Sequence, residues 1–118
     1  IERKHMPYYE HVFIARPEIA PQQVEGIVES LKKLVNDEGG KPVYTEYWGL
    51  RHLAYKINKN ERGHYSLIRI DSPSSTIKEL ERVQSLNENV IRYITIKTKE
   101  LSEKPSVMMK SSEKKDVY

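Results

Sequence analysis

The chain has 118 residues, of which 20 are basic and 17 acidic, and it contains no cysteine. This length predicts one domain, and the lack of cysteine excludes a disulfide framework and thiolate chemistry. No apolar run approaches the ~20 residues of a membrane-spanning helix, and the basic start lacks the apolar segment of a secretion signal.

The N-terminal segment leads into a first predicted strand. Met6 is a candidate initiator, so residues 1–5 are expected to be a cloning remnant or an N-terminal extension. Residues 8–15 are rich in aromatic and β-branched side chains, which favours a strand, and Pro17 ends it. Alternation places Tyr9, His11, Phe13 and Ala15 on one face of this strand and Tyr8, Glu10, Val12 and Ile14 on the other.

An amphipathic helix follows the first strand. Pro21 suits the first turn of a helix, where a missing N–H costs nothing, and Gly39-Gly40 suits a left-handed C-terminal cap. Between them, apolar residues recur at intervals of three and four and predict one buried stripe. The stripe consists of Val24, Ile27, Val28, Leu31, Leu34 and Val35.

Two strands, a second helix and a last strand complete the order. Residues 41–57 and 63–71 have strand composition, and Gly49 predicts a bulge or bend in the first of them. Thr76 and Glu79 stand at capping-box spacing before a second helix. The apolar positions of this helix are Ile77, Leu80, Val83 and Leu86, and a strand rich in β-branched residues follows from residue 90.

The resulting order, β-α-β-β-α-β, predicts an α+β, ferredoxin-like fold with a four-stranded antiparallel sheet and both helices on one face. We assign this domain to residues 6–97. Residues 98–118 show no periodicity and are expected to be disordered on their own, because they cannot bury enough apolar surface. Their one apolar cluster, either a small docking element or an incidental part of an unstructured terminus, is Val107, Met108 and Met109.

Residues 49–58 read G-L-R-H-L-A-Y-K-I-N, which resembles the pattern typical of the bacterial-type small-subunit (30S) ribosomal protein S6 family. The resemblance extends from about Met6 to Lys97. It implies a structural protein without enzymatic activity or cofactor, located in the cytoplasm within a bacterial ribosome, with an organellar ribosome as the alternative. It also implies binding to the central domain of small-subunit ribosomal RNA as a heterodimer with ribosomal protein S18, and a monomer when free.

Basic side chains on the predicted strands are candidates for RNA contact, because Arg offers phosphate a planar fork and Lys a point charge. The alternative is protection of sheet edges against aggregation, and the net charge of +3 fits either interpretation. Basic residues at the positions of Arg51, Arg92 and Lys97 match the family pattern, which favours RNA contact at these three positions. The candidates are Arg51, His52, Lys56, Arg92 and Lys97.

Apolar side chains on the face away from the helices predict a contact with a protein partner, since an exposed patch of this kind usually marks an interface. The candidates are Tyr8, Val12, Tyr65 and Leu67, together with the tail residues Val107, Met108 and Met109. An error of one residue in strand phase would exchange the two faces. Trp48 fits either the core or an interface and is more often core.

Other functions receive less support from the sequence. The four histidines have no zinc spacing, and neither a nucleophile elbow nor a phosphate-binding glycine loop occurs. The glycine-aromatic signature of an RRM is also missing. The alternatives kept open are a metabolite-sensing or oligomerising ferredoxin-like module that ignores RNA and, more weakly, a small acyl-phosphate hydrolase.

Overall fold

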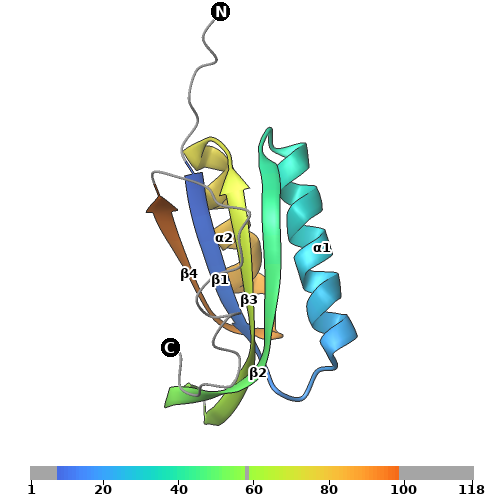
Figure 1. Cartoon of the computed structure of the whole chain (residues 1–118), viewed down its shortest axis with the longest axis vertical. Coiled ribbons are helices and arrows are strands. Elements are labelled where there is room, and N and C mark those ends of the chain that lie inside the picture. Colours follow the sequence, from blue (N-terminus) through green and yellow to red (C-terminus); the bar gives the residue numbers. More distant parts are fainter. Residues whose placement is uncertain (1–7, 58, 99–118) are drawn as a thin grey trace, which may run out of the picture.

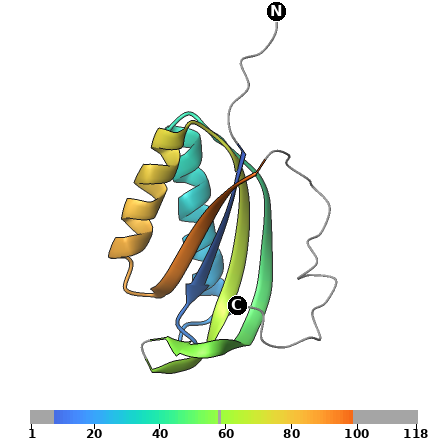
Figure 2. The ribbon, with the colours of Figure 1, turned by 90° about the vertical axis from the view of Figure 1, so that its left-hand side faces the viewer.

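The computed structural model describes residues 8–57 and 59–98, which form a twisted sheet with two helices packed on one face (Figures 1 and 2). The sheet has four strands in the order β2-β3-β1-β4, and every neighbouring pair is antiparallel. The ferredoxin-like prediction is confirmed. The elements are β1 (Tyr8–Ala15), α1 (Pro21–Asp37), β2 (Lys41–Ile57), β3 (Asn60–Asp71), α2 (Ser74–Leu86) and β4 (Val90–Thr98).

The strands β2 and β3 are much longer than their neighbours and continue as a two-stranded ribbon (Figure 1). β3 begins at Asn60, so the predicted start at Gly63 was wrong by three residues. Asn60 pairs with Ile57 and Arg62 with His52 of β2, because the connection between the two strands is short. Lys59 between them has a φ of 68°, the left-handed conformation that tight hairpin turns require.

Both ends of α1 follow the predicted capping. Pro21 occupies the first turn, and the side-chain oxygen of Gln23 accepts a hydrogen bond of 2.8 Å from the Ala20 N–H. At the other end Gly39 has a φ of 87°, and the Gly40 N–H donates to the Val35 carbonyl over 2.8 Å. This is a Schellman motif, in which a glycine adopts the left-handed conformation at little cost.

The start of α2 differs from the prediction. Pro73 holds the N-cap position without a side-chain cap, so the expected capping box of Thr76 and Glu79 was wrong. The Thr76 hydroxyl instead donates to the Glu38 carbonyl, over 2.9 Å, and so ties α2 to the end of α1. Leu86 is 69% exposed, because the buried stripe of the helix continues through Gln84 rather than through Leu86.

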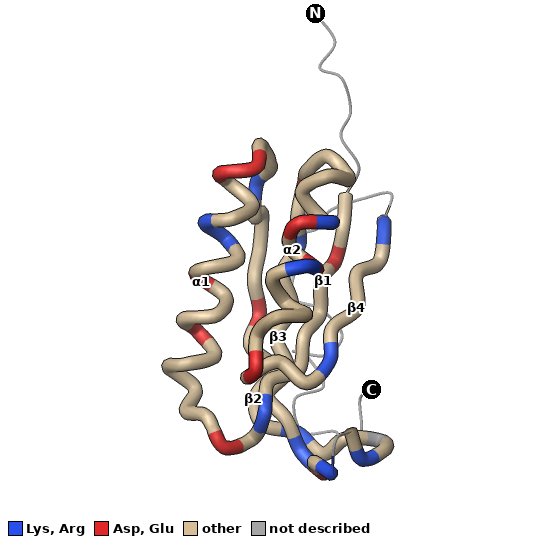
Figure 3. Tube along the Cα trace, turned by 180° about the vertical axis from the view of Figure 1, so that it is seen from behind, with Lys and Arg blue, Asp and Glu red and all other residues tan. Residues whose placement is uncertain are grey.

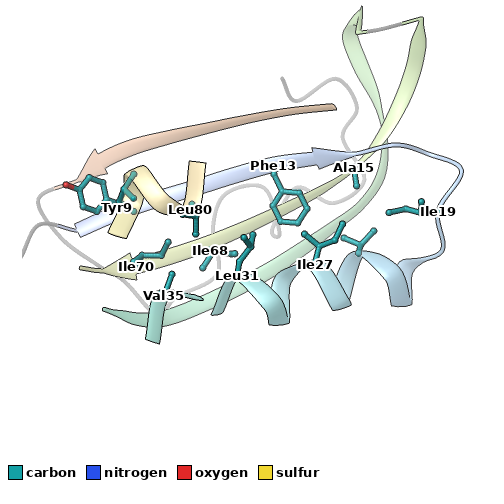
Figure 4. Close-up of a cluster of buried hydrophobic side chains, with 12 residues drawn as sticks. Tyr9, Phe13, Ala15, Ile19, Ile27, Leu31, Val35, Ile68, Ile70 and Leu80 are labelled. Carbon is teal, nitrogen blue, oxygen red and sulfur yellow. The ribbon is translucent and has the colours of Figure 1, made fainter. Parts of the chain in front are cut away.

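The main core lies between the helices and the sheet (Figure 4). The buried stripe of α1 packs against one face of β1 and β3, where Phe13 and Ile68 are fully buried. Tyr9, Phe13 and Ala15 belong to this cluster, so the predicted assignment of β1 faces is confirmed. The helices leave the other face of the sheet available for a binding site.

We expect Gly26→Ala to raise the free energy of unfolding by about 0.5–1 kcal/mol, because glycine inside a helix leaves more chain entropy to be lost on folding. Gly26 is exposed in the middle of α1, and an added Cβ would meet no atom within 4 Å. The midpoint of urea unfolding measures the effect. Gly40→Ala is the matched control and should destabilise, because its Cβ would lie 2.5 Å from the Ser72 Cβ.

Neither helix is long and apolar enough to cross a membrane in the part of the chain that the structure describes. The predictions for residues 1–5, for Met6 and for the tail cluster Val107, Met108 and Met109 lie outside the described residues. Thr98, one residue beyond the predicted end of the domain, is the last residue of β4 and pairs with Tyr8.

Candidate nucleic-acid interface

The sheet face away from the helices carries a second apolar cluster. Val12, Tyr65 and Leu67 belong to it and point away from the helices as predicted, but they are only 6%, 0% and 2% exposed. The expectation of an exposed patch at these three residues was therefore wrong. The bent ribbon explains the burial, because Trp48 and Leu53 of β2 belong to the same cluster.

Gly49 is the bend point of the ribbon. Its φ is 90°, and the β2–β3 register shifts between Tyr47 and Gly49, so the predicted bulge is confirmed. The Trp48 ring beside it stacks on Tyr65, with ring centroids 6.0 Å apart and planes 20° apart. The Trp48 indole N–H also donates to Glu46 over 2.7 Å. Stacking and hydrogen bond together fix the direction in which the ribbon leaves the sheet.

The structure separates two residues that the sequence grouped. Arg51 is buried, and its Nε–H donates to the Trp48 carbonyl over 2.8 Å. The expectation that it is displayed on the surface was wrong, because its guanidinium satisfies backbone freed by the bulge. His52, one residue later, is exposed and lies opposite Arg62 of β3.

The free end of the ribbon is the most basic part of the described surface near the open face. Figure 3 shows Lys and Arg gathered there, whereas acidic residues are frequent on α1 and α2. Lys56 is exposed and forms a loose ion pair with Glu61, 3.4 Å apart. Lys59 and Arg62 are also exposed, and neither was among the RNA-binding candidates predicted from the sequence. To include Arg62, the prediction would have needed the register of the hairpin, which places Arg62 opposite His52.

On β4, alternation places Arg92 and Lys97 on opposite faces. Arg92 pairs with Ile14 and therefore lies on the open face, while Lys97 pairs with Tyr9 of the helix-side core. Both side chains are exposed, but the strand does not bring them together. Arg92 thus joins the basic ribbon end in one region, and Lys97 lies apart near the other end of β4.

A further arginine on the open face is already engaged within the fold. The Arg69 Nε lies 2.9 Å from a Glu10 carboxylate oxygen, and its guanidinium lies 5.0 Å from the Tyr44 ring centroid. A hydrogen bond to the Glu46 carboxylate raises the pKa of the neighbouring Tyr44 phenol. This network balances charge across β1, β2 and β3, so the basic character of the open face is concentrated at the ribbon end.

The family model for ribosomal protein S6 matches residues 8–97. The chain is 48% identical over 111 residues to the small ribosomal subunit protein bS6 of Ruegeria sp. (strain TM1040), covering 94% of this chain and 95% of the relative. It is 49% identical to bS6 of Paramagnetospirillum magneticum, covering 94% of this chain and 77% of the relative.

The crystal structure of 30S ribosomal protein S6 from Thermotoga maritima has the same fold. It is 30% identical to this chain, with a TM-score of 0.75, and the match covers 80% of this chain and 89% of that one. The bacterial relatives are proteins of the small ribosomal subunit. The chain belongs to the ribosomal protein S6 family and is a structural, non-enzymatic constituent of the small subunit of the cytoplasmic ribosome.

Proposed function

We propose that the chain binds the central domain of small-subunit ribosomal RNA together with ribosomal protein S18. The observation that carries the proposal is the set of exposed basic side chains on a ribbon whose direction is fixed by buried contacts. Family membership supports an association with ribosomal RNA. The role is architectural: the ribbon reaches beyond the sheet and neutralises phosphates where RNA segments meet.

The five predicted RNA-binding residues take different parts in this proposal. Three of them are exposed and contact phosphate or sugar: His52 and Lys56 on the ribbon, and Arg92 on β4. Arg51 acts indirectly, because its hydrogen bond to the Trp48 carbonyl braces the bend that presents them. Lys97 contacts RNA at a separate place, since it lies on the other face of β4.

The protein partner is proposed to cover the opposite end of the open face, away from the ribbon tip. Ile96 is 48% exposed there, and Tyr8 on the neighbouring strand is half-buried. Val12, Tyr65 and Leu67 contribute only indirectly, as members of the buried cluster beneath the bent ribbon. The tail begins after Thr98 at the same end, so its cluster Val107, Met108 and Met109 remains a predicted partner contact.

We expect binding to a central-domain RNA fragment to be tight and strongly salt-dependent in the presence of S18. Each phosphate contact removed, as in Lys56→Gln or Arg92→Gln, should lower the slope of log K against log [salt] by about 1. Lys78→Gln, an exposed lysine on α2, is the matched control and should leave affinity and slope unchanged. Absence of binding with and without S18, with all components folded, would reject the proposal.

A further inference from the structure

A groove of about 270 Å³ lies on the open face between the bent ribbon and β4. The ribbon forms one wall and β4 forms the other, while β1 supplies an aliphatic floor. The groove is lined by Val12, Ile14, Tyr55, Ile57, Arg92, Tyr93 and Ile94. The buried cluster and the proposed partner surface do not explain why the open face has a groove at this place.

Tyr55 is the unusual member of this lining. Its side chain is 83% exposed, although Leu53 two residues earlier is buried and Ile57 two residues later is half-buried. No hydrogen bond joins its hydroxyl group to another residue within 8–57 and 59–98. The ring therefore contributes little to the free fold and stands ready to cover a ligand.

The opposite wall carries a cation that also lacks an internal role. Arg92 is exposed and forms no ion pair within the described ranges. An apolar protein segment in the groove would desolvate this guanidinium without pairing it, which is costly. An RNA strand would pair it with phosphate, and the basic side chains of Lys56, Lys59 and Arg62 nearby favour the same polyanion.

The size and chemistry of the groove suit one planar ring. Its volume lies below the ~300–1,000 Å³ of pockets that enclose whole drug-sized ligands, so it does not enclose a long segment. An aromatic wall, an aliphatic floor and an arginine are the groups on which proteins stack unpaired bases. We propose that the groove binds one unstacked base of the ribosomal RNA against Tyr55, with Arg92 on the adjoining phosphate. This inference rests on the RNA binding proposed above.

The test compares RNA affinity of variants in the presence of S18, at several salt concentrations. Tyr55→Leu should weaken binding by about 10- to 100-fold, the range for one stacked base, and leave the salt slope unchanged. Tyr55→Phe should bind nearly as well as the wild type because the ring is kept. Arg92→Gln should lower the salt slope by about 1. Leu86→Ala, which truncates an exposed apolar side chain on α2, is the matched control.

The outcomes separate this inference from the proposed function. Wild-type binding with normal salt dependence, combined with an unchanged affinity of Tyr55→Leu, would overturn the base site and leave RNA binding intact. A loss of S18 binding by Tyr55→Leu in the absence of RNA would also overturn it, because the groove would then hold a protein side chain. Crosslinking of 4-thiouridine-substituted RNA to Tyr55 would support the stacking geometry directly.

Discussion

Acidification from pH 6.5 to pH 4.5 should lower the free energy of unfolding by about 2 kcal/mol more in the wild-type chain than in His11→Gln. The His11 ring is fully buried, and burial lowers its pKa from 6.5 to about 3. Its Nδ1–H donates to the Thr95 hydroxyl over 2.8 Å, and the Gln84 amide donates to its Nε2 over 2.9 Å. The folded chain thus holds a neutral imidazole.

The direction of the effect follows from proton binding. Between pH 6.5 and about 3 the unfolded chain binds a proton at His11 that the folded chain rejects, so acid favours unfolding. The contribution of His11 to stability is complete above pH 6.5 and is lost as the pH falls toward about 3, a total of about 5 kcal/mol.

Urea unfolding at a series of pH values measures the effect, and the difference between wild type and variant cancels the titration of shared carboxylates. His52→Gln, which replaces an exposed histidine by the same residue, is the matched control. Parallel stability curves for the wild type and His11→Gln would contradict the prediction.

The fold could be predicted from the sequence because its local signals agree with one another. The stripe of α1, its Pro21 start and its Gly39 end all describe the same helix, and period-two alternation gives the two faces of β1. The errors occur where a tertiary contact replaces the local one. Thr76 could cap its own helix, but the nearby Glu38 carbonyl takes its hydroxyl instead.

The site was less predictable, because exposure depends on how the ribbon bends in three dimensions. The sequence indicated a bend at Gly49 but not its direction, and the direction determines that Tyr65 and Arg51 are covered while Tyr55 and His52 are not. The sequence placed Arg51 with His52 among the RNA-binding candidates only because both side chains are basic and adjacent. A bulge frees backbone carbonyls that a nearby donor can satisfy, and this principle could have suggested an internal role for Arg51.

Trp48, beside the bend at Gly49, should affect both the stability of the fold and RNA binding. We expect Trp48→Ala to lower the free energy of unfolding by about 3–5 kcal/mol, the usual cost of removing a large buried aromatic side chain. The indole is only 6% exposed, stacks on Tyr65 and donates to Glu46. Trp48→Phe keeps an aromatic ring but loses the donor to a buried carboxylate, so we expect a smaller loss of about 1–3 kcal/mol.

Urea unfolding measures the stability of both variants, and RNA affinity with S18 present, at a temperature where each is folded, measures the effect on function. Trp48→Ala should weaken RNA binding even when fully folded, because the ribbon loses the contacts that fix its direction before binding. Tyr47→Phe is the matched control. Tyr47 is next to Trp48 in sequence, but its side chain lies on the helix side of the sheet, where its hydroxyl group is hydrogen-bonded to His64 over 2.7 Å. It should cost about 1 kcal/mol of stability and leave RNA affinity unchanged. Wild-type affinity in folded Trp48→Ala would show that the ribbon reaches its bound direction without the buried cluster.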